Sequence, residues 1–407
     1  MHTILVSAYG CEPYKGSEPG VGWNWVTQMA KTNRLIVITR SNNREPIEKF
    51  PNQECLANVR FYYYDCPLWI RRMKNRAKGL YLYYFFWQLG IIPLVKRLLK
   101  ENNVDYMMHL SFGSMWMPTF LPIFGKPFIW GPVGGGDCEP MTFIRTHGLK
   151  QRVMQTMRFG MNKMSFLIPS VLLASVRAKC IICRTEDSKL AMPWWTRKKV
   201  VIMLETAMEG HIFEYKKCED STSTAVNFIT TGRLMESKNV ITVINALAQV
   251  PKTYDYQYTI IGSGPMKNSI LAAIERYNLV DRVKIIEEIP REEVLHSLES
   301  ADIFLFPSLR EGGSWALMEA MAIGLPVVCL NWSGMAVTTD DNCAIRLDVT
   351  NPNQMAKDMA EAIIKLIEDP FCRKKMGEAG RKRIQEVFNW ESKGKFMCKL
   401  LEKLDKQ

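Results

Sequence analysis

Short apolar runs that alternate with helical patterns are the feature of this 407-residue chain that most limits its fold. The first run lies near the N-terminus, and a helical pattern follows the glycine-rich stretch CEPYKGSEPGVG at residues 11–22. Buried strands that alternate with helices form parallel sheets covered by helices on both faces. Further strands are expected at residues 35–39, 59–62, 104–110, 126–130, 227–231, 256–261, 282–286, 303–307 and 327–330.

The chain is longer than one hydrophobic core usually spans, so two domains are expected. The composition changes near Glu205, and residues 216–223 are polar, as a linker would be. We therefore predict an α/β protein with two doubly wound, Rossmann-like parallel-sheet domains that face a central cleft. The first domain is expected over residues 1–205 and the second over residues 206–384.

Positive charge is concentrated in the first of these domains. Residues 1–205 carry 28 basic and 13 acidic residues, a net charge of +15, whereas the remainder carries 25 and 28, a net charge of −3. Residues 71–100 and 142–185 each hold eight basic residues and no acidic one. The middle of the first segment, GLYLYYFFWQLGIIPLV, is aromatic but short for a spanning helix and interrupted by glycine and proline.

Aromatic residues flanked by cations suit the surface of an anionic bilayer. We therefore expect peripheral membrane contact through Arg71, Arg72, Lys74, Arg76 and Lys78. A buried amphipathic helix with solvated cations at its ends is the alternative that this pattern leaves open.

Cysteine usage and the N-terminus indicate a reducing compartment. The eleven cysteines are odd in number, and residues 1–7 lack the basic and long apolar regions of an export signal. We expect a cytoplasmic protein on the inner face of the membrane. Cys180 and Cys183 lie in an expected strand, where residues three apart point to opposite faces, so two buried apolar side chains are favoured over a metal site.

The segment REGGSWALMEAM, residues 310–321, follows an expected strand and carries two carboxylates. Glu311 is expected in the loop and Glu319 in the helix after it, while the Gly312–Ser314 backbone amides would lie at the helix start, which favours an anion. This arrangement suits a ligand with hydroxyls at both ends and a phosphate between them.

Two more loops follow expected strands. Arg233 and Lys238, in TGRLMESK, can converge on one phosphate group, or they can be solvated surface cations. Gly262 and Gly264, in IIGSGP, do not complete a dinucleotide fingerprint, because Lys267 stands where the third glycine belongs. Ligands bind at the carboxyl ends of strands in open α/β sheets, so the three loops predict one binding edge.

The order and spacing of GRLMESK, IIGSGP and REGGSWALMEAMAIGLPVV resemble those of the retaining glycosyltransferases of family 4, among the bacterial glycosyl transferases group 1. The resemblance covers nearly the whole chain and is most specific in the C-terminal half. SEPGVGWNW and HLSFGSMWMP in the N-terminal half are similar to one bacterial branch of that family. The resemblance implies the GT-B fold, with a C-terminal helix at about residues 385–407 that packs back on the N-terminal domain.

The resemblance also implies roles for individual residues. Arg233 and Lys238 would hold the diphosphate of a nucleotide-sugar donor. Glu319 would bind the ribose hydroxyls, and Glu311 the hydroxyls of the transferred sugar. His109 would lie near the anomeric end of that sugar, although a lone histidine at a strand end is often structural.

The other donor contacts implied by the resemblance are backbone or close-approach positions. The base would rest near Ile289 and Pro290, held mainly by backbone. The remaining implied contacts are Gly20, Gly22, Gly262, Gly264, Gly313, Ser314 and Trp315.

The expected reaction is transfer of a sugar, with retention, from a UDP- or GDP-linked donor to a glycan or lipid-linked acceptor in bacterial surface polysaccharide synthesis. Fixed cations and helix-start amides would stabilise the charge that develops on the leaving diphosphate. Many glycosyltransferases hold a metal through an Asp-x-Asp pair, and the nearest match here is Asp137-Cys138-Glu139, so no metal or other cofactor is expected.

Two other function classes stay open at this point. One is a sugar-nucleotide epimerase of GT-B type, which would need acid and base carboxylates around the sugar. The other is a non-catalytic basic module for nucleic acid, although no recognised nucleic-acid motif supports it and no nucleic-acid partner is expected.

Overall fold

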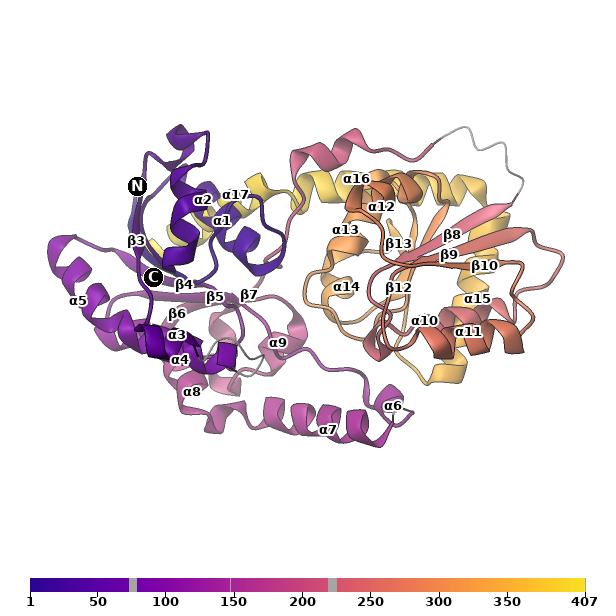
Figure 1. The fold of residues 1–407 in the computed structure, drawn as a ribbon, viewed down its shortest axis with the longest axis horizontal. Coiled ribbons are helices and arrows are strands. Elements are labelled where there is room, and N and C mark those ends of the chain that lie inside the picture. The colour runs from indigo at the N-terminus through magenta and orange to yellow at the C-terminus, as the bar shows by residue number, and fades with distance from the viewer. Residues whose placement is uncertain (73–78, 147, 219–224, 407) are drawn as a thin grey trace. The chain divides into compact units, whose positions relative to one another are not determined.

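The computed structural model describes residues 1–72, 79–146, 148–218 and 225–406 (Figure 1). The chain divides into two compact units. Unit 1 consists of Met1–Gly136, Gly160–Glu205 and Trp390–Gln407, and unit 2 consists of Asp137–Phe159 and Thr206–Asn389.

Unit 1 is built on a parallel seven-stranded sheet in the order β3-β2-β1-β4-β5-β6-β7. The central strands β4 and β5 are buried along their whole length because helices cover both faces. The strands are β1 (Thr3–Ala8), β2 (Arg34–Thr39), β3 (Val59–Tyr63), β4 (Tyr106–Ser111), β5 (Phe128–Val133), β6 (Ala178–Cys183) and β7 (Val200–Ile202).

The helices of unit 1 include the C-terminal one, α17 (Trp390–Asp405), which packs on α1. The Tyr106 hydroxyl donates to Asp405 at 2.7 Å, and the Lys179 ammonium donates to the Leu404 carbonyl at 2.6 Å, so the end of α17 is tied to the sheet. The others are α1 (Ser17–Ala30), α2 (Arg44–Glu48), α3 (Leu68–Arg72), α4 (Gly79–Gly90), α5 (Ile92–Glu101), α8 (Pro169–Arg177) and α9 (Glu186–Leu190), with the 3₁₀ turns η1 (Ser41–Asn43), η2 (Gln53–Leu56), η4 (Leu121–Phe124), η5 (Ser165–Leu167) and η6 (Trp194–Lys199).

Unit 2 contains a parallel six-stranded sheet in the order β10-β9-β8-β11-β12-β13. Its strands are β8 (Val226–Thr231), β9 (Tyr256–Ile261), β10 (Val283–Ile286), β11 (Ile303–Phe306), β12 (Val327–Leu330) and β13 (Ala344–Leu347). Its helices are α6 (Met141–Ile144), α10 (Val240–Leu247), α11 (Lys267–Arg276), α12 (Arg291–Glu299), α13 (Trp315–Ile323), α14 (Ser333–Thr338), α15 (Pro352–Glu368) and α16 (Pro370–Val387), with the 3₁₀ turns η7 (Gly210–Glu214) and η8 (Glu236–Lys238).

The segment Asp137–Phe159 comes from the N-terminal half of the chain but belongs to unit 2. Hydrogen bonds tie it there: the Trp332 indole donates to the Cys138 carbonyl at 3.1 Å, and the Thr142 hydroxyl donates to the Thr350 carbonyl at 2.8 Å. Helix α7 (Leu149–Lys163) runs from this segment into unit 1.

The fold class predicted from the alternating pattern is confirmed, with two doubly wound parallel sheets that contain the expected strands. Strands β7 and β13, one at the edge of each sheet, were not predicted. The glycine-rich stretch differs from the expectation of a loop up to residue 22. Helix α1 already begins at Ser17, so Gly20 and Gly22 lie in its first turns. Pro19 does not prevent this, because a proline in the first helical turn removes an N–H that has no helical partner.

The aromatic run at residues 79–95 forms α4 and the start of α5. One side of α4 is core: Tyr83, Tyr84 and Trp87 are buried, while Tyr81 and Phe85 are exposed. Within the described residues, no helix is long and apolar enough to cross a membrane.

Of the predicted membrane contacts, Arg71 and Arg72 are exposed on α3, whereas Lys74, Arg76 and Lys78 lie outside the described residues. Cys180 and Cys183 are both buried in β6, as the strand pattern predicted.

Candidate functional site

In unit 2, the loops after β8 and β9 are joined to each other through their backbones. The Gly232 amide donates to the Ile261 carbonyl at 2.9 Å, and the Leu234 amide donates to the Ser263 carbonyl at 2.8 Å. Gly262 has a φ of +153°, and a Cβ atom there would lie 1.9 Å from the Gly232 carbonyl oxygen. Only glycine permits this approach, so the two loops form one rigid edge.

Lys238 lies at the end of η8, in the loop that follows β8. It lines a small pocket together with Gly232, Arg233 and Phe306, and its ammonium is 5.4 Å from the centroid of the Phe306 ring. The Leu309 amide donates to the Ser237 carbonyl at 2.7 Å, which joins this loop to the one after β11. Arg233, which also lines this pocket, is exposed. The predicted pair of cations therefore lies at the carboxyl end of β8.

The Glu311 carboxylate forms an ion pair with the Lys238 ammonium. The same carboxylate oxygen accepts a hydrogen bond from the Ser308 hydroxyl at 2.7 Å, and only 11% of the Glu311 side chain is exposed. Glu311 is thus held in place by two donors. The structure brings together one carboxylate and one cation that the sequence placed 73 residues apart.

Helix α13 begins directly after this loop. Ser314 is its N-cap, with a hydroxyl that accepts from the Leu317 amide at 3.4 Å. Gly313 stands close to Thr206, whose hydroxyl oxygen would be 2.3 Å from a Cβ atom on that glycine. The first amides of α13, beginning at Trp315, have no helical acceptor and favour an anion at this end.

Glu319 lies in the second turn of α13 and is 8% exposed. Both Nε and Nη2 of Arg291 donate to its Oε1 atom, at 3.0 and 2.8 Å. Burial raises the pKa of the Glu319 carboxyl, and Arg291 opposes that rise. Arg291 opens α12, immediately after Ile289 and Pro290, so the predicted base-binding backbone lies next in sequence to this ion pair.

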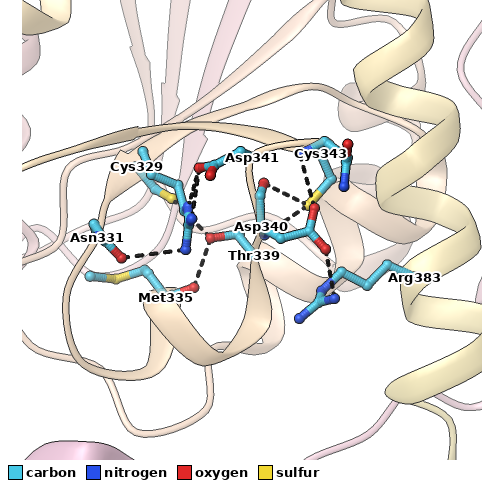
Figure 2. Close-up of polar contacts among 10 residues, drawn as sticks. Cys329, Asn331, Met335, Thr339, Asp340, Asp341, Cys343 and Arg383 are labelled. Atoms are coloured by element: carbon cyan, nitrogen blue, oxygen red, sulfur yellow. Dashed lines mark hydrogen bonds and ion pairs between the residues drawn. The ribbon is translucent and has the colours of Figure 1, made fainter.

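Helix α14 supports the Glu311 loop from its own N-terminus. The Glu311 carbonyl accepts from the Gly334 amide at 2.9 Å and lies 2.6 Å from the Ser333 hydroxyl. The turn after α14 is anchored by Arg383, which pairs with Asp340 at 2.7 Å (Figure 2). Arg383 also donates to the carbonyl of Thr338, the last residue of α14. This anchoring fixes the helix that holds the loop.

The residues predicted in the N-terminal half lie in unit 1. His109 is 1% exposed in β4, and its Nε2 atom is 3.4 Å from the Tyr84 hydroxyl oxygen. Burial lowers the pKa of His109 to about 4, with a smaller opposing effect from the Phe112 backbone, so the ring is neutral near pH 7. A Cβ atom on Gly22 would lie 2.0 Å from the Gly10 carbonyl oxygen, and one on Gly20 would lie 1.8 Å from the Lys15 carbonyl oxygen.

The structure therefore gathers Arg233, Lys238, Glu311 and the start of α13 in unit 2, and it places Glu319 farther along the same helix. Sequence reasoning missed the partners of these residues: Ser308, Arg291 and Ser333. Ser308 is three residues before Glu311, and Arg291 directly follows the predicted base site, but a short polar residue or a surface arginine carries no motif of its own.

The C-terminal part of the chain matches a described family. Residues 213–383 match the family model of glycosyl transferases group 1, which confirms that resemblance. Assignment to family 4 within that group stays a prediction.

Two curated relatives each match a little less than half of the chain. The chain is 31% identical over 195 residues to the amylovoran biosynthesis glycosyltransferase of Erwinia amylovora, covering 46% of this chain and 47% of the relative. It is 30% identical over 189 residues to a putative colanic acid biosynthesis glycosyltransferase of Escherichia coli K12, covering 45% and 46%. The chain thus spans about half the length of these relatives.

Among solved structures, sucrose-phosphate synthase from Thermosynechococcus elongatus is similar, with a TM-score of 0.63 over 99% of both chains. The sequences are 18% identical, so the likeness concerns the fold alone. It confirms the expected GT-B fold class of two Rossmann-like domains.

Proposed function

We propose that this chain is a retaining glycosyltransferase that takes a sugar from a UDP- or GDP-linked donor. The observation that carries the proposal lies in the loops after β8 and β11 of unit 2, which the hydrogen bond from Leu309 to Ser237 joins. There, Lys238 and Glu311 contact each other beside Arg233 and the first amides of α13. A diphosphate needs fixed positive charge, and a sugar needs an oriented hydrogen-bond acceptor. The cations and the Glu311 carboxylate both lie in loops at the carboxyl ends of the strands of unit 2.

In the proposed reaction, an acceptor hydroxyl oxygen forms a bond to the anomeric carbon as the bond from that carbon to the diphosphate oxygen breaks. Negative charge grows on the leaving diphosphate, which takes up the proton of the acceptor hydroxyl. Arg233 can bind two phosphate oxygens through its planar guanidinium, and Lys238 supplies a point charge. Together with the first amides of α13, they stabilise the leaving group without a metal ion. We therefore propose that no metal is required.

The Glu311 carboxylate accepts hydrogen bonds from the hydroxyls of the transferred sugar, and Glu319 accepts from the ribose hydroxyls. His109, whose ring is neutral near pH 7, is proposed to lie near the anomeric end of the sugar. The base is proposed to contact backbone near Ile289 and Pro290.

The proposed acceptor is a glycan or lipid-linked glycan in bacterial surface polysaccharide synthesis. Two glycosyltransferases named for amylovoran and colanic acid biosynthesis support this class of acceptor. A lipid-linked acceptor requires access to a membrane surface, and exposed Arg71 and Arg72 on α3 support the proposed contact with an anionic leaflet.

Thermal unfolding with candidate donors tests the proposal. The protein is melted with UDP, GDP and their common sugar conjugates, each with EDTA and with magnesium. A ligand at about one hundred times its dissociation constant adds roughly 2.7 kcal/mol to the free energy of unfolding. We expect a higher melting temperature with one diphosphate series, unchanged by EDTA. A shift that disappears with EDTA contradicts metal independence, and no shift with any nucleotide contradicts the donor site.

A further inference from the structure

The carboxyl edge of the unit 1 sheet carries a row of polar and aromatic side chains. One follows each of β1, β2, β3 and β4 within two residues, in the order Tyr9, Arg40, Asp65 and Phe112. These four strands are neighbours in the order β3-β2-β1-β4, and the order of strand addition reverses between β1 and β4. Open α/β sheets bind ligands at the carboxyl ends of their strands, at such a reversal. The donor proposal assigns none of these four side chains.

Aromatic rings pack around Phe112 at this edge. The Phe112 ring stacks on the buried Tyr84 ring, with centroids 4.2 Å apart, and meets the Tyr9 ring edge-on at 5.3 Å. Phe112 itself is partly exposed, and Tyr81, whose ring centroid is 6.1 Å from that of Phe112, is 57% exposed. Phe112 has a φ of +64°, which is rare for a bulky residue and is typical of ligand-binding sites. We call Tyr81 and Phe112 the aromatic platform.

Arg40 joins this cluster through Tyr9. Its guanidinium carbon lies 4.6 Å from the centroid of the Tyr9 ring, and its Nη1 atom donates to the Tyr9 hydroxyl at 3.5 Å. The Nε atom of Arg40 is buried and has no hydrogen-bond acceptor within the described residues. A guanidinium offers five N–H donors in a planar fork, which matches the oxygens of a carboxylate or a phosphate.

The carboxylates at this edge are bound to other donors. Asp65 accepts a hydrogen bond from the Tyr83 hydroxyl at 2.5 Å. Glu18, at the start of α1, accepts from a backbone amide of the loop after β4 at 2.8 Å and lies 3.7 Å from Arg184. Among the described residues, Arg40 has contacts with the Tyr9 side chain but no ion pair with a carboxylate. Its charge is therefore available to an acidic ligand.

We propose that unit 1 binds the acceptor as a sugar with an acidic group, its ring on the aromatic platform and its carboxylate or phosphate on Arg40. The C–H face of a sugar ring is apolar and packs on aromatic side chains, whereas the guanidinium forms paired hydrogen bonds with the acid. The Nε2 atom of His109, which is proposed to lie near the anomeric end of the donor sugar, is 3.4 Å from the hydroxyl oxygen of Tyr84, the ring on which Phe112 stacks. Sugar transfer to this acceptor rests on the function proposed above, and the acidic group with its contact to Arg40 is new.

Saturation-transfer NMR titrations of the full chain, without nucleotide, test this assignment. The probes are the methyl glycosides of glucuronic and galacturonic acid, the 6-phosphates of glucose and galactose, and the neutral methyl glucoside and methyl galactoside. The variants are Arg40→Gln, Arg40→Lys and Tyr81→Ser. Arg60→Gln is the matched control, because Arg60 is an exposed arginine of β3 in the same unit.

We expect the wild type and Arg60→Gln to bind a uronate or a 6-phosphate at least about tenfold more tightly than the matching neutral sugar, because Arg40 adds charge-assisted hydrogen bonds. The series that binds more tightly identifies the acid as a carboxylate or a phosphate. Arg40→Gln should lose the preference but keep its affinity for the neutral sugar, and Arg40→Lys should keep part of the preference because it keeps the charge. Tyr81→Ser should weaken acidic and neutral sugars by the same factor, since ring packing does not depend on charge.

The proposal is overturned if no acidic sugar binds the wild type more tightly than its neutral counterpart, or if Arg40→Gln keeps the preference. Melting temperatures show whether each variant folds. If Arg40→Gln does not fold, unchanged affinities in Arg40→Lys and Tyr81→Ser overturn the proposal in its place. Binding of UDP and GDP is measured separately: a failure there contradicts the donor site alone, whereas absent acid selectivity in a protein that binds UDP or GDP contradicts the acceptor assignment alone.

Discussion

Lys238 and Glu311 are proposed to serve different parts of the donor, yet in this structure they pair with each other. Each keeps the other oriented before any donor binds, and Ser308 supplies the second hydrogen bond to Glu311. In the proposed donor site, an incoming diphosphate would add negative charge beside Lys238 and find that cation already in place. Such preorganisation costs no rearrangement at the moment of reaction.

Arg291 gives a test at the level of one side chain. Burial raises the pKa of Glu319, and Arg291 opposes that rise, so Arg291→Ala should raise the pKa further. The protonated carboxyl accepts ribose hydroxyls less well. The affinity of the variant for UDP or GDP should therefore fall as the pH decreases, by up to about tenfold per pH unit.

Calorimetric titration across pH 6–8 measures this effect. The affinity of the wild type for UDP or GDP should change less with pH than that of Arg291→Ala. Arg291→Lys should lie between the two, because it keeps the positive charge. Parallel pH profiles for the wild type and Arg291→Ala would contradict a role for Arg291 in keeping Glu319 ionised.

His109 predicts a pH dependence of stability. Its pKa is about 4 in the folded protein and about 6.5 when unfolded, so only the unfolded chain takes up the proton between these values. Stability from this group is complete above about pH 6.5 and is lost as the pH falls toward 4, by roughly 3 kcal/mol in total. Urea unfolding of the wild type and His109→Gln at several pH values measures this dependence. If the free energy of unfolding changed with pH by the same amount in both proteins, the prediction would be contradicted.

At the scale of elements, most strands could be predicted from their apolar runs. The run at residues 327–330 coincides with β12, because a strand buried on both faces leaves a continuous apolar signature. The run at residues 256–261 coincides with β9, in which the apolar positions are interrupted by exposed Gln257. The start of α1 could not be read in the same way, since Gly16, Pro19 and Gly20 look like a loop. The close contacts of Gly20 and Gly22 that require glycine appear only in three dimensions.

The candidate site was predictable to the extent that its residues sit in loops after strands. The predicted topology placed the loops of Glu311 and Lys238 at the same edge of the sheet. Their ion pair could not be predicted, because it depends on how the two loops meet. The support from Ser333 depends on α14, a six-residue helix with no distinctive pattern. Partners that are distant in sequence, such as Arg291 and Glu319, leave no local signal.

The close approach of the loops after β8 and β9 predicts an effect on stability. Gly262→Ala should lower the free energy of unfolding by about 1–3 kcal/mol, because alanine is strained at this φ and its Cβ atom meets the Gly232 carbonyl. Gly210→Ala is the control, since a Cβ atom there meets nothing within 4 Å, and its effect should stay within about 0.5 kcal/mol. Urea unfolding measures both variants. If their free energies of unfolding were equal, the close approach of the two loops would be contradicted.

In the whole molecule, the two halves of the chain differ in net charge. Residues 1–205, with a net charge of +15, contain Arg71 and Arg72, which are exposed on α3 and proposed to contact lipid. The remainder, with a net charge of −3, contains the loops proposed to bind the donor. Only a few local cations are needed there, because a diphosphate is recognised by groups within hydrogen-bonding reach rather than by overall charge.

The loops of unit 2 are proposed to bind a nucleoside diphosphate through Lys238 and Arg233. Isothermal titration of UDP and GDP into the full chain, in EDTA, measures this binding. The variants are Lys238→Ala and Arg233→Ala, with Lys252→Ala as the control, because Lys252 is an exposed lysine of the same unit outside the proposed site. Lys238→Arg and melting temperatures show whether charge or folding accounts for a loss.

We predict that one diphosphate binds the wild type and Lys252→Ala with equal affinity. Lys238→Ala and Arg233→Ala should each bind at least about tenfold more weakly, since each loses a charge-assisted hydrogen bond. If both variants bind like the wild type, or if neither diphosphate binds the wild type with or without magnesium, the donor site proposed for unit 2 is wrong.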